Sequence, residues 1–139
     1  DVGDLLRAVR ALAALDARLA SRPWSSLQAA AVRRAPKLAA HEVAALFTLC
    51  ADLGFVPSAG LTEALGQRAR DVAGEMAPQD VADTLDAYAR IGAVPGPVLL
   101  SALLARAQQV APQMDARQVT NTLDAYASFK HGRDPAAES

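Results

Sequence analysis

The chain has 139 residues, enough for one domain with a substantial core, and 52% of them are hydrophobic although only 4% are aromatic. A formal net charge of -1 excludes binding of nucleic acid through overall charge, and the lone Cys50 excludes an internal disulfide and a cysteine-based metal cluster. No apolar run is long enough to span a bilayer, so we expect no membrane partner.

Alanine and leucine are the main apolar residues, and their spacing predicts helices along most of the chain. In chain order, the predicted helices lie near residues 3–15, 23–35, 40–53, 58–73, 78–91, 97–111 and 115–129. Pro78 suits a first helical turn, and Gly92 is placed to end the same helix in a left-handed conformation. Asp115 and Gln118 form a capping-box pattern. We expect the polar tail from Lys130 to Ser139 to be disordered.

An internal repeat organises these helices. The stretch Thr84–Ala89 recurs unchanged at Thr122–Ala127, an offset of 38 positions, and the same offset places Gly54 on Gly92. Repeats start near residues 3, 41, 79 and 117, and each contains a first helix, A, and a second helix, B. The short linkers make A and B antiparallel neighbours. One pair cannot bury its apolar face alone, so we predict an all-α fold, an α-solenoid over residues 1–129.

The same register predicts which apolar residues are buried and which lack a cover. Six residues are expected in the core: Val81, Leu85, Tyr88, Leu99, Leu103 and Val110. The last A helix has no B helix after it within this chain. We therefore expect Val119, Leu123 and Phe129 to form an interface that is covered by a partner or by more of the same chain, because exposed apolar patches mark interaction sites.

Two stretches, Gln79–Ala89 and Gln118–Ala127, resemble helix A of the octotricopeptide repeat family of organelles, and they are also similar to the helical repeats of mitochondrial proteins with a RAP domain. Asn121 fits the family pattern, whereas Asp83 and Asp86 stand where the family has Asn and Trp. The resemblance covers residues 3–129 and implies RNA binding inside mitochondria or chloroplasts. It also implies membership of a ribonucleoprotein such as the mitochondrial ribosome.

No cluster of side chains predicts an active site. Cys50 aligns with Tyr88 on the core face, so we expect a small buried hydrophobe and no nucleophile. The two histidines, His41 and His131, are too scattered for a metal site. We therefore expect a protein that is not an enzyme, with no catalytic residue, cofactor or small-molecule substrate.

The aromatic and carboxylate side chains have two readings each. Tyr88, Tyr126 and Trp24 have the ring that stacks on bases, but their positions favour packing. Asp83 and Asp86 lie three residues apart, a spacing open to acid–base chemistry, but on a repeating helix it is more typical of a solvated face.

The outer face of helix A varies between repeats while the core positions stay apolar. Its three columns are Arg7, Ala45, Asp83 and Asn121; Arg10, Thr48, Asp86 and Asp124; and Ala14, Asp52, Arg90 and Ser128. Such variation is typical of a changeable RNA-reading surface on a shared scaffold, and equally of an ordinary solvated face. Both interpretations stay open.

Basic residues are concentrated at the N-terminal end. Residues 1–40 carry seven basic and three acidic residues, a net charge of +4, whereas residues 41–78 and 79–116 carry -3 and -2. Arg33, Arg34 and Lys37 close the first B helix, where the helix dipole favours cations. Arg7 and Arg10 lie near the start of the first A helix, where the dipole disfavours them, so phosphate is the natural explanation.

Two hypotheses follow from these observations. The first is an organellar RNA-binding component of a ribonucleoprotein, mitochondrial or alternatively chloroplast, with RNA and neighbouring proteins as partners. Its predicted RNA-binding residues are Arg7, Arg10, Arg33, Arg34, Lys37, Arg90 and Asn121. The second is a protein–protein scaffold of the same fold without direct RNA contact, which the acidic middle of the chain favours.

Overall fold

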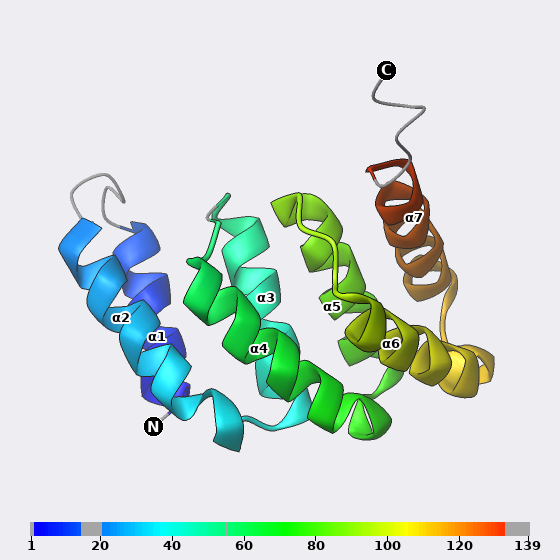
Figure 1. The fold of residues 1–139 in the computed structure, drawn as a ribbon, viewed down its shortest axis with the longest axis horizontal. Helices are drawn as coiled ribbons and strands as arrows, with labels where there is room; N and C mark the ends of the chain where they lie inside the picture. The colour runs from blue at the N-terminus through cyan, green and yellow to red at the C-terminus, as the bar shows by residue number, and fades with distance from the viewer. Residues whose placement is uncertain (1, 15–20, 55, 133–139) are drawn as a thin grey trace.

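The computed structural model describes residues 2–14, 21–54 and 56–132, and within these ranges the chain is helical without any strand (Figure 1). The α-helices are α1 (Val2–Ala14), α2 (Ser21–Arg34), α3 (Ala40–Asp52), α4 (Ala59–Val72), α5 (Pro78–Ile91), α6 (Pro97–Val110) and α7 (Ala116–Gly132). Three short 3-10 helices extend α2, α4 and α6: η2 (Ala35–Lys37), η3 (Ala73–Glu75) and η4 (Ala111–Gln113). The predicted helix positions are therefore confirmed to within a few residues.

The helix ends follow the local sequence. Pro78 occupies the first turn of α5, and Asp80 accepts a hydrogen bond from the Ala77 backbone N–H at 3.1 Å. Gly92 ends α5 with a φ of 87°. The predicted capping box is confirmed, because the Asp115 side chain accepts from the Gln118 N–H at 2.8 Å and the Gln118 side chain accepts from the Asp115 N–H at 3.0 Å.

The predicted start of the disordered tail is wrong. Helix α7 continues through Lys130 and His131 to Gly132, and residues 133–139 lie outside the described part. Nothing in Phe129-Lys130-His131 breaks a helix, and a positive charge such as Lys130 is favoured near a helix C-terminus. The polar composition of the segment was mistaken for an end of the helix.

The helices form two layers. One layer, the A layer, contains α1, α3, α5 and α7, and the other, the B layer, contains α2, α4 and α6 (Figure 1). Within the A layer α3 packs against α5 and α5 against α7; within the B layer α2 packs against α4 and α4 against α6. Each A helix also contacts the B helix that follows it, from α1 with α2 to α5 with α6.

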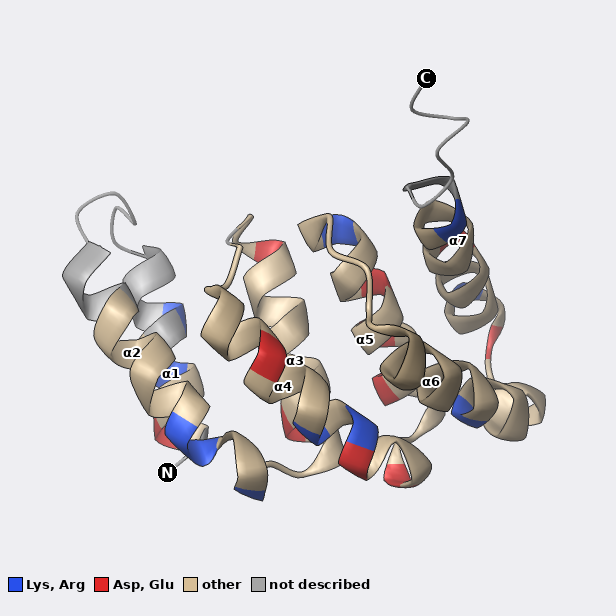
Figure 2. Cartoon of the chain, in the orientation of Figure 1, with Lys and Arg blue, Asp and Glu red and all other residues tan. Residues whose placement is uncertain are grey.

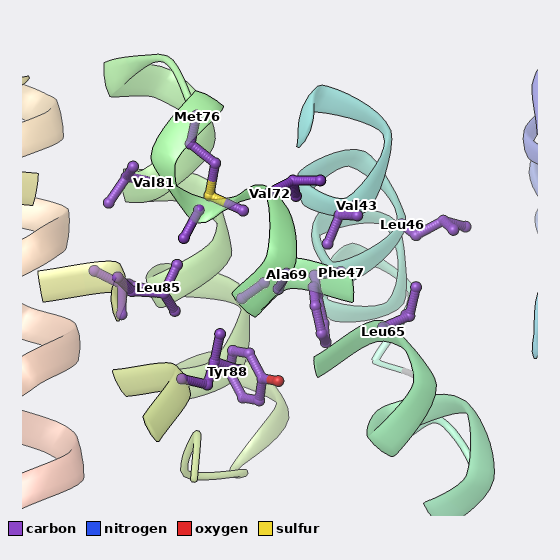
Figure 3. Packing of buried hydrophobic residues seen from close by; sticks show 14 of the residues in the cluster. Val43, Leu46, Phe47, Leu65, Ala69, Val72, Met76, Val81, Leu85 and Tyr88 are labelled. Atoms are coloured by element: carbon purple, nitrogen blue, oxygen red, sulfur yellow. The ribbon is translucent and has the colours of Figure 1, made fainter. Parts of the chain in front are cut away.

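The core lies between the two layers and runs from pair to pair (Figure 3). All six residues predicted to be buried are at most 8% exposed, as expected: Val81, Leu85, Tyr88, Leu99, Leu103 and Val110. The rings of Phe47 and Tyr88 join α3 to α5, with centroids 4.6 Å apart and planes tilted by 37°. A Cβ on Gly66 of α4 would lie 3.3 Å from the Tyr88 hydroxyl, so this glycine makes room for the tyrosine.

Two arginines in the B layer make the same contact. Arg68 Nε of α4 donates to the Leu38 carbonyl at 2.7 Å, and Arg106 Nε of α6 donates to the Met76 carbonyl at 2.8 Å. Leu38 and Met76 end η2 and η3, where carbonyl groups lack a helical partner. Each B helix is thereby tied to the end of the B helix before it.

Candidate functional site

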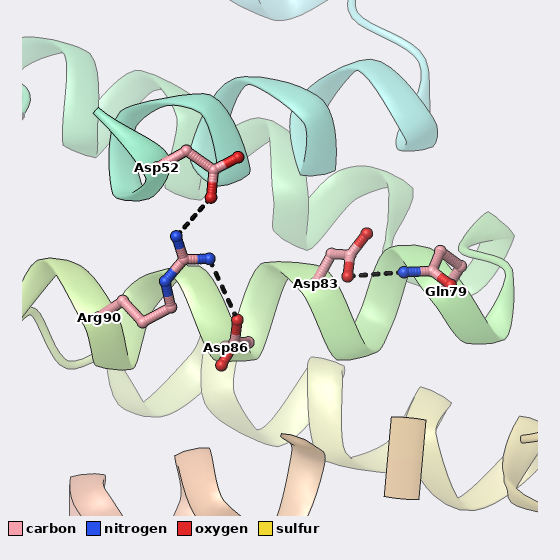
Figure 4. A network of polar contacts seen from close by, with 5 residues as sticks. All are labelled: Asp52, Gln79, Asp83, Asp86 and Arg90. Atoms are coloured by element: carbon pink, nitrogen blue, oxygen red, sulfur yellow. Dashed lines mark hydrogen bonds and ion pairs between the residues drawn. The ribbon is translucent and has the colours of Figure 1, made fainter. Parts of the chain in front are cut away.

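The outer face of α5 is a linked polar surface (Figure 4). Asp83 accepts a hydrogen bond from Gln79 Nε2 at 2.7 Å, and Gln118 Nε2 of α7 donates to Gln79 Oε1 at 3.0 Å. Asp83 was predicted to lie on the outer face of helix A, and all three side chains are half-buried or exposed. Their hydrogen-bonding groups already serve contacts within the A layer.

Arg90 lies between two carboxylates on this face. Its guanidinium pairs with Asp52 of α3 and with Asp86 of its own helix, the latter at 3.4 Å (Figure 4). The hydrogen bond to Asp52 is the main cause that raises the pKa of Arg90 above its ordinary value. A phosphate would have to compete with both carboxylates for this cation.

Sequence reasoning missed this ion-pair network although the signal was present. Asp52 and Arg90 are 38 residues apart, which places them in the same column of neighbouring repeats. Opposite charges at such positions face each other whenever the A helices pack side by side. The column was interpreted as either a reading surface for RNA or an ordinary solvated face, and ion pairing within it was not considered.

Five predicted RNA-binding residues form what we call the basic end, in the first helix pair: Arg7, Arg10, Arg33, Arg34 and Lys37. All five side chains are exposed. Arg7 also pairs with Asp4, one turn earlier in α1. Figure 2 shows Lys and Arg on α1, at the end of α2 and on the turn after it, whereas red and blue segments mix along α4 and α5. The basic end therefore presents five cations to solvent, of which Lys37 lines one pocket with Glu75 and Asp80.

The remaining predicted contact for RNA, Asn121, is half-buried on α7. The next position of its face is Asp124, an exposed carboxylate. Neither residue is close in sequence to the basic end, and the structure does not bring them to it. The predicted RNA-binding residues thus fall into one basic group and two separate positions, Arg90 and Asn121.

A hollow of about 380 Å³ opens between α6 and α7 at the other end of the molecule. Val119, Leu123 and Tyr126 line it from α7 and are 38%, 63% and 43% exposed. Two of the three residues predicted to form a partner interface, Val119 and Leu123, therefore lie open to solvent. Tyr126, which the sequence favoured for packing, is open as well.

The third predicted interface residue, Phe129, is only 2% exposed, so its placement at an open face was wrong. At about 100° per residue along a helix, Phe129 shares a stripe with Thr122 and Ala125, which are also buried. This stripe faces α5, the neighbour against which α7 packs. Val119 and Leu123 belong to the adjoining stripe, which faces the hollow.

Of the side chains considered for catalysis or metal binding, the structure describes those of Cys50, His41, Asp83 and Asp86. Cys50 is 7% exposed, as expected for a core residue, and burial raises its pKa from 9.0 to about 11. His41 is exposed, and the side chains of Trp24 and His131 lie outside the described part. Within the described ranges no cluster of three His, Cys, Asp or Glu residues is suited to a metal ion, and none of the helices there has the length and hydropathy of a membrane span.

Comparison with known protein families gives a match over most of the chain. A family model described as RNA-editing substrate-binding complex 6 protein matches residues 1–134. No curated protein matches the chain significantly. The matched family is not the octotricopeptide repeat family, so that assignment was wrong. The stretch that carried the resemblance contains Leu85 and Tyr88, which are buried between stacked helices, and stacked helix pairs of other families need such residues too.

Proposed function

The chain belongs to the RNA-editing substrate-binding complex 6 family, and we propose that it is a non-enzymatic component of an RNA-editing complex in mitochondria. The RNA-editing complexes of kinetoplastids reside in this organelle. The family name favours such a complex over the expected mitochondrial ribosome, and nothing favours a chloroplast. Burial keeps the thiol of Cys50 protonated, so this cysteine is not an activated nucleophile. This observation supports a non-enzymatic role.

We infer that the helix pairs form an α-solenoid whose unit is the repeat seen in the sequence. The support is that neighbouring pairs contact each other layer by layer and that equivalent contacts recur. Arg68 and Arg106 occupy equivalent positions of neighbouring units, and they make the same hydrogen bond to carbonyls that are also at equivalent positions. Such a scaffold stacks along one direction and presents a long outer face to RNA and proteins.

RNA contact at the basic end is the function that the charges support best. The single observation that carries it is the set of five exposed cations in the first helix pair. Along the rest of the A layer, carboxylates such as Asp83 and Asp124 would repel a phosphate backbone. We therefore propose that the RNA touches one end of the molecule and does not run along the whole outer face.

A protein scaffold without RNA contact is the second candidate. The engagement of Arg90 by Asp52 and Asp86 favours it, because it removes the central cation of the outer face from phosphate binding. The pairing of Arg7 with Asp4 points in the same direction. Both proposals use the same fold and differ only in whether the basic end meets RNA or an acidic protein.

Charge reversal at the basic end separates the two. Arg7→Glu combined with Arg10→Glu should weaken binding to unrelated RNA sequences about equally. It should also flatten the slope of log K against log salt by roughly one to two units, because fewer counterions are released. The measurement is a fluorescence-anisotropy titration of the full chain at several salt concentrations.

The matched control makes the same change in net charge at two arginines outside the basic end. Arg70 and Arg117 are both exposed and lie outside the basic end, so Arg70→Glu with Arg117→Glu should leave the salt slope near that of the unmodified chain. Equal binding by both double variants, or no salt-dependent RNA binding at all, would favour the protein scaffold.

A further inference from the structure

The hollow between α6 and α7 is an apolar groove without an occupant. Its floor comes from α6 and η4, its wall comes from α7, and α6 and α7 scarcely touch each other. The residues that matter for its chemistry are Leu104, Ala107, Met114, Val119, Leu123 and Tyr126.

The equivalent groove one unit earlier is filled. Shifting the six lining residues back by one repeat gives Gly66, Ala69, Met76, Val81, Leu85 and Tyr88, on α4, after η3 and on α5. Gly66 is half-buried, the other five are at most 3% exposed, and α6 packs against α4, η3 and α5. The molecule itself therefore shows what such a groove accepts, which is an α-helix with an apolar stripe.

The two B helices that fill such positions share a pattern, Leu-x3-Leu-x2-Arg-Ala-x2-Val. The pattern is Leu61, Leu65, Arg68, Ala69 and Val72 in α4, and Leu99, Leu103, Arg106, Ala107 and Val110 in α6. The aliphatic residues are buried, and the arginine donates to the carbonyl that ends the preceding 3-10 helix.

The open groove offers the same acceptor. Met114 ends η4 as Met76 ends η3, with matching N–H bonds to Ala111 at 3.0 Å and Ala73 at 3.2 Å. A helix bound in the groove would thus contact apolar side chains, and its arginine would have a carbonyl to which it can donate. The occupant is therefore specified by both an apolar stripe and one cation.

A second copy of this chain does not supply such a helix. Its α4 and α6 are buried in its own core, and α2 has Ala30 and Arg34 where the pattern has arginine and valine.

We propose that the groove binds an amphipathic helix of a partner protein that carries this pattern, with its arginine donating to the Met114 carbonyl. The proposal extends the proposed function, on which it rests for the presence of a partner protein in the complex. It concerns the end of the molecule opposite the basic end, so it does not require RNA.

The chain provides its own probe. A fluorescent peptide of residues 58–76, which carries the pattern, should bind the full 139-residue chain, and the peptide with Arg68→Ala should bind roughly tenfold more weakly. In the chain, Leu123→Glu should weaken peptide binding at least tenfold. Val56→Glu is the matched control, because Val56 is 67% exposed, close to the 63% of Leu123, and lies outside the groove; it should leave binding unchanged.

A second measurement tests the proposal in case the isolated peptide is too unfolded to bind. A chain in which a copy of residues 92–114 follows Phe129 directly, in place of residues 130–139, should have a melting temperature several degrees higher. Leu123→Glu should cancel most of that gain. The proposal would be overturned if the peptide did not bind and the extended chain was no more stable than the unmodified chain. It would also be overturned if the unmodified chain formed a dimer that Leu123→Glu abolished. RNA binding by Leu123→Glu should match the unmodified chain, so either proposal can fail without the other.

Discussion

Two tyrosines in identical sequence surroundings have different environments. Tyr88 and Tyr126 each end the run Thr-Leu-Asp-Ala-Tyr before an alanine, yet Tyr88 is 3% exposed and Tyr126 is 43% exposed. The difference comes from α6, which packs on α5 and leaves α7 uncovered. Burial of a residue in this protein is therefore decided by its neighbouring helix pair as much as by its own helix.

This pair makes a sharp test of the packing. Tyr88→Ala should lower the free energy of unfolding by about 3–5 kcal/mol, because it leaves a cavity next to Phe47. Tyr126→Ala removes the same atoms from a half-open site and should cost less than about 1 kcal/mol. Urea unfolding followed by circular dichroism measures both values, and equal costs would contradict the observed packing.

At the residue scale, the sequence alone predicted the burial of residues whose position on the helix leaves only one possible environment. Val81 and Leu85 are apolar in every complete unit, and their burial follows from helical spacing. Phe129 was misjudged because its burial depends on which of two neighbouring helices its side chain faces. Helical periodicity gives the face of a residue only to within a stripe, so it cannot separate contact with α5 from contact with a B helix.

At the scale of elements, local chemistry determines where helices begin and end. Pro78 and the Asp115–Gln118 capping box predicted two helix starts that the structure has. The end of α5 is set by Gly92, whose φ of 87° disfavours residues with a Cβ. The end of α7 was placed too early because the polar composition after Phe129 was taken as the helix end, although the next glycine in the sequence is Gly132, where α7 ends.

Gly92→Ala should therefore destabilise the protein by about 1–2 kcal/mol through backbone strain alone, since nothing lies within 4 Å of the added Cβ. Gly74→Ala is the matched control: the site is equally open and its φ is not positive, so the change should be neutral or slightly stabilising. Thermal melts of the two variants compare them directly, and a similar loss in both would argue against a left-handed residue 92.

At the scale of the whole molecule, the chain has a basic end, an acidic middle and an opposite end with an apolar groove. The basic end exposes five cations, the opposite end exposes an apolar groove, and Asp52, Arg90 and Asp86 pair with one another between them. The charge asymmetry was visible in the sequence, but the ion pairs that engage Arg90 on the outer face became visible only in the structure. The family itself had to come from comparison, because stacked helix pairs of different families share their core pattern.

The central claim is that RNA meets the basic end and not the outer face of the A layer. Ultraviolet cross-linking of RNA to the full chain, followed by mass spectrometry of the cross-linked peptides, tests it most directly. We predict cross-links concentrated in residues 1–40, around Arg7, Arg10 and Arg33. Cross-links centred on α5 and α7, near Asp83 and Asn121, would contradict the account.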